Sequence, residues 1–312
     1  MQQNKIGIAL FTYNRFDLFE QTIVSLNNNL LSIEFDLYVF SDGPKSEQDI
    51  GEIKKIRDYV SDFKGFKTIK LFSKDENLGL FNSILQGINF VLKDYDSVIV
   101  LEDDLITNRY FLTYMRDALN YYKNDDRICQ ISGYSYFNEF YKSKKYNLDK
   151  TFVIRGADCL GWATWQDRWN YFDQDHVINE IKKLKNPIYK YRFNKNGSYP
   201  FSKLLSRQKL KKDSWAVLWY SYNFNFNKNT IYPHQSFVKH IGNDKRSTNY
   251  STESISDPLS VYFNKVEYID YDFNSVNTVY RSEIFYRKFL KRFKLDLINR
   301  VKTYIQLKFN IS

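Results

Sequence analysis

The sequence predicts an α/β fold in which helices cover a mostly parallel sheet. Between residues 5 and 132, short apolar segments typical of strands alternate with segments whose apolar residues recur at helical spacing. Strands separated by helices form right-handed βαβ units, and these units produce a parallel sheet. The chain has 312 residues, 43% of them hydrophobic, and can therefore bury a core large enough for such a sheet.

The individual elements follow from local signals. Ser46 and Asp49 have the spacing of a capping box and predict the start of the second helix. Past residue 133 the alternation weakens and Trp and Tyr become frequent, so we divide the chain into regions 1–135, 136–250 and 251–312. The predicted strands are Ile6–Phe11, Phe35–Phe40, Thr68–Phe72, Ser97–Leu101 and Ile128–Ser132, and the predicted helices are Phe16–Asn28, Ser46–Ser61, Leu80–Leu92 and Asn108–Tyr122.

The net charge of +10 is unevenly distributed along the chain. Residues 181–212 carry eleven Lys and Arg and no acid, and residues 281–312 carry a net charge of +7. Subtracting both segments from +10 leaves the remaining residues at −8. Codon bias in an AT-rich genome explains many lysines, but it does not explain the absence of acids from 32 consecutive positions. We expect an acidic body with two basic patches.

Several protein classes and locations are disfavoured. The chain has no Gly-rich phosphate loop of the NTPase or dinucleotide type, and its three His are scattered. The two Cys do not form a disulfide framework, the N-terminus has no signal-peptide pattern, and no window of eighteen residues is apolar throughout. We expect a cytoplasmic protein.

The most informative motif is Glu102-Asp103-Asp104, which ends a strongly apolar strand. Three consecutive carboxylates repel one another unless a cation or solvent relieves the repulsion. Mg²⁺ and Mn²⁺ typically bind one or two protein carboxylates together with substrate phosphate oxygens. The motif therefore predicts a metal-diphosphate site, and the alternative is a solvated acidic turn that caps the next helix.

Three other loops follow predicted strands in a specific order, namely Thr12-Tyr13-Asn14-Arg15, Ser41-Asp42-Gly43 and Asn77-Leu78-Gly79-Leu80. Together with the acidic triplet, they resemble the nucleotide-sugar-binding half of family 2-like glycosyltransferases with the Rossmann-like GT-A fold. The triplet also resembles the Glu-Asp-Asp form of the DxD motif in N-acetylglucosaminyltransferase I. This resemblance implies a metal-dependent transferase, inverting and using UDP-sugars, that acts in bacterial surface polysaccharide synthesis.

The resemblance also implies roles for individual residues. Asp42 would accept hydrogen bonds from the nucleotide base, and Thr12 and Arg15, with Asn14 between them, would lie beside the base and diphosphate. A metal ion, Mn²⁺ or Mg²⁺, would bind Asp104. The remaining donor-site residues implied by the resemblance are Asn77 and Gly79, which let the backbone pass close to the donor, and Glu102 and Asp103, which face the ribose and sugar.

A late His in some GT-A enzymes completes metal coordination, and His240 stands at a similar place, although a structural His is an alternative. The loop residues also have alternative structural roles, since Asn14 and Asn77 could be turn residues and Arg15 a surface cation. The sequence alone leaves these alternatives open.

The second region resembles the acceptor side of the same enzymes. Asp213 stands two residues before Trp215 and is the predicted catalytic base, because inversion needs a carboxylate to take the proton of the acceptor hydroxyl. Asp167 and Asp173 are the reserve candidates for this role. The predicted acceptor residues are Gly161, Trp162, Trp165 and Trp215, whose indole rings either stack on sugars or pack in the core.

The predicted partners are a nucleotide-sugar donor and an anionic glycan or lipid-linked acceptor, with no nucleic acid. The two basic segments read as amphipathic helices, which suit the inner, anionic face of a membrane, a contact with the protein's own body or a dimer contact. Rival functions are a sugar nucleotidyltransferase and a non-catalytic protein of the same fold that binds nucleotide sugars or nucleic acid.

Overall fold

The computed structural model describes residues 4–135, 151–170, 172–194, 201–208, 214–233, 236–242 and 273. The predicted base Asp213 and the basic tail at 281–312 lie outside these residues. Among the described helices, none is long and apolar enough to cross a bilayer.

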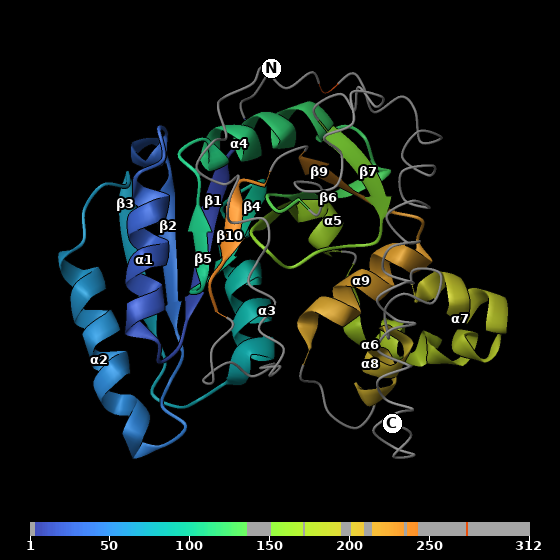
Figure 1. Ribbon diagram of the computed structural model, residues 1–312, viewed down its shortest axis with the longest axis horizontal. Coiled ribbons are helices and arrows are strands. Elements are labelled where there is room, and N and C mark those ends of the chain that lie inside the picture. Colours follow the sequence, from blue (N-terminus) through green and yellow to red (C-terminus); the bar gives the residue numbers. More distant parts are fainter. Residues whose placement is uncertain are drawn as a thin grey trace, which may run out of the picture.

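A central sheet of eight strands organises the molecule (Figure 1). Six of its strands run in one direction, while β7 and β8 run antiparallel to their neighbours. The predicted α/β class with a mostly parallel sheet is therefore confirmed. In spatial order the strands are β3 (Thr68–Ser73), β2 (Asp36–Ser41), β1 (Ile6–Thr12), β4 (Ser97–Glu102), β8 (Trp162–Trp165), β6 (Ile128–Ser132), β9 (Asn229–Pro233) and β7 (Thr151–Arg155).

Helices cover both faces of this sheet because successive strand residues point to opposite sides. Ile8 and Leu10 of β1 pack in a core with α1 (Phe16–Asn27), α2 (Glu47–Asp62) and α4 (Phe111–Tyr122). Ala9 and Phe11, on the other face, pack with α3 (Gly79–Val91) and α9 (Trp215–Asn225). Both faces of β1 and β4 are thus buried, as expected for parallel strands.

The structure also contains short elements for which the sequence pattern gave no bounds. The 3₁₀ segment at Phe273 packs on Tyr122, whose hydroxyl donates to its carbonyl at 3.2 Å. Within the basic segment 181–212, which was expected to contain an amphipathic helix, residues Phe201–Arg207 form α8. The remaining elements are η1 (Ser32–Glu34), α5 (Gln166–Asn170), α6 (Gln174–Asn179), η2 (Glu180–Lys185), α7 (Pro187–Phe193) and α8 (Phe201–Arg207).

A two-stranded sheet closes the region next to the end of β4. β5 (Leu105–Thr107) pairs antiparallel with β10 (Val238–His240), and His240 lies opposite Leu105. The Ile241 amide extends this contact by donating to the Asp104 carbonyl at 2.9 Å. A late segment of the chain is thereby fixed beside the acidic triplet.

The loop after β1 is held by α2. Asp49, in the first turn of α2, accepts hydrogen bonds from the Tyr13 hydroxyl at 2.9 Å, from Asn14 Nδ2 at 2.6 Å and from the Ser46 amide at 2.8 Å. The predicted capping box is confirmed. Burial opposes ionisation of Asp49, but the hydrogen bonds from Asn14, Ser46 and Tyr13 outweigh it and lower its pKa to about 2.

We predict that Asp49→Asn destabilises the protein at pH 7 by about 1 kcal/mol, after discounting the pKa shift for solvent screening. Because the folded-state pKa is lowered, the stabilisation exists above pH 4 and is lost as the pH falls toward 2. Urea unfolding of both proteins from pH 6 to pH 3 should therefore give converging free energies. Asp58→Asn, at an exposed ion pair of the same helix, is the control, and a pH-independent difference for Asp49→Asn would contradict the assignment.

Candidate active site

The carboxyl ends of β1, β2 and β4 meet at one edge of the sheet and bring most of the predicted donor residues together. The Asp42 amide donates to the Thr12 carbonyl at 3.1 Å, and the Thr12 hydroxyl donates to Asp103 Oδ2 at 3.1 Å. Phe11 lies in register with Glu102 on the neighbouring strand. In open α/β sheets this edge is where ligands bind.

Asp103 is a buried carboxylate held by the loop after β1. It is 4% exposed and accepts from the Tyr13 amide at 3.2 Å in addition to the Thr12 hydroxyl. Arg15 Nη2 donates to Asp103 Oδ1 at 2.5 Å. Burial raises the pKa of Asp103, and the Arg15 charge offsets only part of that effect.

Asp104 is also buried, at 9% exposure, and faces two cationic or potentially cationic side chains. Its Oδ2 atom accepts from Arg15 Nη2 at 2.9 Å and lies 3.5 Å from His240 Nε2. Burial opposes ionisation of Asp104, but His240 and Arg15 hold its pKa below the ordinary value. The two carboxylates in turn raise the pKa of Arg15, although burial alone would lower it.

Glu102 differs from its neighbours because, among the described residues, it forms no ion pair. Burial and repulsion from Asp104 and Asp103 raise its pKa to about 8, while a hydrogen bond from the Trp215 side chain acts in the opposite direction. The triplet is therefore not the solvated acidic turn that the sequence left open as an alternative.

The residues present fit a divalent metal with a small protein ligand set. Within the described ranges, no group of three or more His, Cys, Asp or Glu side chains has metal-binding geometry. Asp104 Oδ2 and His240 Nε2 nevertheless face each other, and they provide the oxygen and imidazole ligands that Mn²⁺ accepts. Only a glycine at position 242 lets the backbone pass this close to the carboxylate, because a Cβ there would lie 2.0 Å from Asp104 Oδ2. Substrate phosphates would have to supply further ligands.

Asp42 is fully engaged within the protein. Its Oδ1 accepts from the amides of Gly43 and Leu78 at 2.9 and 2.8 Å, and its Oδ2 accepts from the Gly79 amide and Asn77 Nδ2 at 2.9 and 3.2 Å. A carboxylate has about four lone-pair sites, and all four are used. Asp42 thus holds the β3–α3 loop and the amino end of α3, where a negative charge is also favoured by the helix dipole.

The other predicted donor residues have structural partners as well. Asn77 donates to the Gly43 carbonyl at 2.9 Å, Gly79 has a positive φ of 75°, and Asn14 is bound to Asp49. A cavity of about 170 Å³ opens beside Asp42, between β2, β3 and α3, and Phe40, Phe72 and Phe90 form its aromatic wall.

The predicted acceptor tryptophans pack in the core. Trp162 is completely buried beside Val100 and stacks on Trp215, with ring centroids 5.3 Å apart. Trp165 lies opposite Ser97, at the other edge of the sheet, and its indole donates to the Leu119 carbonyl. Gly161, with a φ of 58°, packs against Val238 of β10. The structure thus brings Gly161, Trp162 and Trp215 near the triplet and Trp165 away from it.

The catalytic base cannot be placed among the described residues, since Asp213 lies outside them. Of the reserve candidates, Asp167 is exposed and paired with Arg168 at 2.5 Å, on α5 at the opposite edge of the sheet, and Asp173 is exposed. The sequence reasoning missed two further residues near the triplet, Gly242 and Tyr13. The signal for Gly242 was its position two residues after His240.

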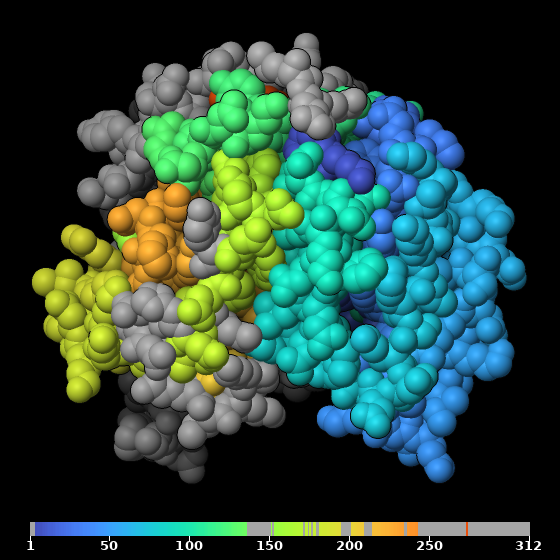
Figure 2. All heavy atoms as spheres, turned by 180° about the vertical axis from the view of Figure 1, so that it is seen from behind, coloured from blue at the N-terminus to red at the C-terminus, as the bar shows by residue number. Residues whose placement is uncertain are grey.

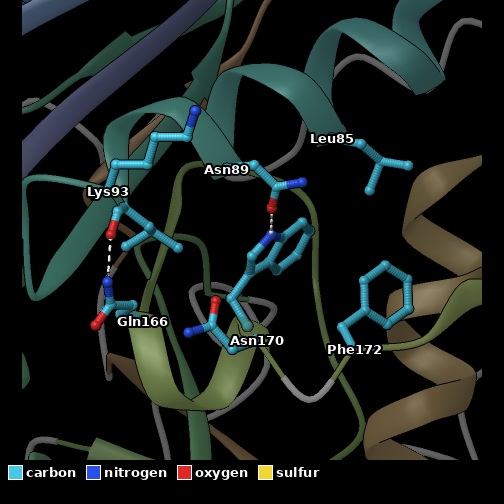
Figure 3. Close-up of a pocket in the computed structure, with 8 residues that line it drawn as sticks. Leu85, Asn89, Lys93, Gln166, Asn170 and Phe172 are labelled. Atoms are coloured by element: carbon cyan, nitrogen blue, oxygen red, sulfur yellow. Dashed lines mark hydrogen bonds between the residues drawn. The ribbon is translucent and has the colours of Figure 1, made fainter.

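A larger cavity, of about 400 Å³, lies away from this edge (Figure 3). It lies between α3 and α5, on the side of the molecule where the surface of α3 adjoins that of residues 151–170 (Figure 2). The Trp169 indole donates to Asn89 Oδ1 at 2.7 Å within it. None of the predicted site residues lines this cavity. We therefore place the candidate site at the carboxyl ends of β1, β2 and β4, where the charged side chains converge, and not at the larger cavity.

We predict that Asp42→Asn destabilises the protein by about 1–3 kcal/mol, because an amide nitrogen replaces one oxygen that now accepts two hydrogen bonds. Urea unfolding at pH 7 provides the measurement. Asp75→Asn, an exposed change in the same loop, is the matched control. Equal stability of the Asp42 variant and the wild type would show that the hydrogen bonds between Asp42 and the β3–α3 loop do not stabilise the fold.

Comparison with known proteins gives a family and a set of remote structural neighbours. The model of Glycosyl transferase family 2 matches residues 8–212, which is more than half of the chain and includes the described site loops up to α8. No curated protein matches the chain.

The structural neighbours are distant, and the chain spans less than two thirds of the length of each. The mannosyltransferase PcManGT from Pyrobaculum calidifontis, in complex with GDP-Man and Mn²⁺, is 14% identical, with a TM-score of 0.31 over 42% of this chain and 36% of that one. TarS of S. aureus in complex with UDP-GlcNAc is 15% identical, with a TM-score of 0.32 over 41% and 33%. TarS 1–349 alone gives 12% identity and a TM-score of 0.43 over 75% and 59%.

The family match and the architecture agree. The mostly parallel sheet flanked by helices matches the GT-A fold of glycosyltransferases. The chain belongs to glycosyl transferase family 2.

Proposed function

We propose that this chain transfers a sugar from a nucleotide-sugar, UDP-linked, to a glycan or lipid-linked saccharide acceptor. The observation that carries the proposal is the convergence of Arg15, Asp103, Asp104 and His240 at the carboxyl edge of the sheet. A buried cluster of opposite charges at this edge suits a ligand that carries both a diphosphate and a metal.

The donor half of the proposed site rests on Thr12, Arg15 and Asp42. Arg15 forms ion pairs with Asp103 and Asp104 at the acidic strand end and can offer N–H groups to a diphosphate. Base recognition by Asp42 requires one of its four internal hydrogen bonds to open. The proposed donor residues also include Asn14, Asn77 and Gly79, which shape the loops around that edge.

Asp104 and His240 would hold the Mn²⁺ or Mg²⁺ ion. When bound, such an ion offsets the negative charge that develops on a departing diphosphate. Glu102 and Asp103 are proposed to face the ribose and the sugar, in the manner of the Glu-Asp-Asp form of N-acetylglucosaminyltransferase I. Burial and the neighbouring Asp104 and Asp103 raise the pKa of Glu102, so a positive charge brought to this edge would favour its ionised form.

The acceptor half of the proposal names Asp213 as the base of an inverting reaction. A base must take the proton of the acceptor hydroxyl while that oxygen attacks the anomeric carbon from the side opposite the diphosphate. Trp215, two residues after Asp213 in the sequence, begins α9, and its side chain forms a hydrogen bond with Glu102 of the acidic triplet. Gly161 and Trp162 would support the acceptor pocket from behind.

The acceptor is proposed to be anionic, in bacterial surface polysaccharide synthesis at the cytoplasmic face of the membrane. The described part of the basic segment keeps its charges at the surface, since Lys182, Lys203 and Arg207 are each partly or fully exposed. Such charges attract anionic groups and are weakened by salt.

We predict that Asp104→Ala lowers metal-dependent hydrolysis or transfer of the preferred nucleotide-sugar by about 10²-fold or more, because the diphosphate loses the charge that offsets it. A screen of UDP-, GDP- and other nucleotide-sugars with Mn²⁺ identifies the donor and supplies the assay. Asp94→Ala, at an exposed carboxylate after α3, is the control. Circular dichroism should give the same fold for both variants.

Three outcomes of these experiments would contradict the proposal. Retained turnover of Asp104→Ala would exclude the metal role. Binding of nucleotide-sugars without turnover would indicate a non-catalytic protein, and formation of a nucleotide-sugar from a sugar phosphate and a nucleoside triphosphate would indicate a nucleotidyltransferase.

We predict that the full chain sediments with vesicles containing anionic lipid and that a chain ending at residue 283 does so less strongly, because seven net positive charges are removed with the tail. Vesicles of neutral lipid are the control. Equal binding of both chains to anionic vesicles, or no binding, would contradict a membrane role for the tail.

A further inference from the structure

Arg15 and the proposed metal would use the same oxygen atom. Arg15 Nη2 donates to Asp104 Oδ2 at 2.9 Å, and His240 Nε2 lies 3.5 Å from that same Oδ2. Gly242 packs closely against the same carboxylate, since a Cβ there would lie 2.0 Å from Asp104 Oδ2. The guanidinium therefore stands where a cation bound to Asp104 and His240 would need its oxygen ligand.

The ion pairs of Arg15 with Asp103 and Asp104 are buried, and among the described residues Arg15 is the only Arg or Lys that forms them. The side chains of Arg15, Asp103 and Asp104 are 15%, 5% and 12% exposed. In the described parts of the chain, no other Arg or Lys forms an ion pair with the two carboxylates. Buried carboxylates without a counter-charge are strongly unfavourable, so some cation must stay beside them whether or not a ligand is bound.

One nitrogen of Arg15 forms both contacts. Nη2 carries two N–H groups, one directed to Asp103 Oδ1 and the other to Asp104 Oδ2. Releasing Asp104 would leave the bond to Asp103 intact and would free one N–H for a phosphate oxygen. The side chain can thus change partner with little movement of its anchor.

We infer that Arg15 acts as an internal counter-cation. In the protein without bound nucleotide-sugar it is ion-paired with Asp104, and the metal ion replaces it at Asp104 when the nucleotide-sugar binds. This inference deepens the proposed function and rests on it for the identity of the ligands. Arg15 is then a positioning residue that couples the two ligands: the diphosphate draws the guanidinium from Asp104, and the metal takes its place. Linkage requires each ligand to increase the affinity of the other.

The test measures Mn²⁺ affinity rather than turnover. The free Mn²⁺ signal in electron paramagnetic resonance is followed during titration of the full chain, without nucleotide and then with saturating UDP. Without nucleotide, Arg15→Gln should bind Mn²⁺ about 10-fold more tightly than the wild type, which is within the usual range of coupling between sites. With UDP the order should reverse, because the variant has lost a phosphate ligand.

Two further variants keep the test decisive. Arg116→Gln removes an arginine that is ion-paired elsewhere, with Asp117 on α4, and should leave both affinities unchanged. Arg15→Lys keeps the positive charge that competes with the metal for Asp104 but loses the fixed geometry of the guanidinium, so it should tighten Mn²⁺ binding less than Arg15→Gln. If Arg15→Gln fails to fold without metal, the Lys variant decides.

Unchanged or weaker Mn²⁺ binding by Arg15→Gln and Arg15→Lys without nucleotide would overturn the exchange. Tighter binding without the reversal in UDP would overturn the part played by the diphosphate. Failure of the proposed transferase function is distinguishable, because it would appear as absent turnover in the donor screen while the Mn²⁺ titrations still report on Arg15.

Discussion

The burial of two adjacent carboxylates beside one arginine is the constraint on which the site depends. Asp103 and Asp104 lie at the end of a strand that is buried on both faces, where charge is costly unless it is paired. Arg15 pairs with both, and it can do so because β1 and β4 are neighbours in the sheet. The loop after β1 must therefore stay close to the end of β4, and Asp49 on α2 holds it there through Asn14.

The same constraint explains the position of the small sheet. The chain leaves β4 through Asp104 and immediately forms β5, which pairs with β10. This pairing places His240 and Gly242 against Asp104 although they come from a distant part of the sequence. On the other side, Trp215 contacts Glu102 from the start of α9. Three separate segments thus meet at three consecutive acidic residues.

The first half of the fold could be predicted from the sequence because its strands and helices carry clear periodic patterns. The strand ends were located to within about one residue, as for Thr12 and Glu102. The predicted start of α4 at Asn108 was too early, because Asn108 forms a turn and accepts from the Tyr110 amide. The strands of the second half were not predicted, since β8 and β10 have only four and three residues and depend on partners far along the chain.

The site was predictable by residue type but not by partner. The resemblance to family 2-like glycosyltransferases selected Arg15, Asp42 and Asp103. It could not reveal that Arg15 bridges two carboxylates or that Asp42 already accepts four internal hydrogen bonds. These partners have a physical consequence. Each contact that a nucleotide-sugar makes with these side chains must replace an internal hydrogen bond of comparable strength. Such a bond contributes only about 0.5–1.5 kcal/mol net. A ligand that contacts the site at one point would therefore gain little binding free energy. The proposed nucleotide-sugar, with its base, its diphosphate and an accompanying metal ion, would replace several internal contacts at once.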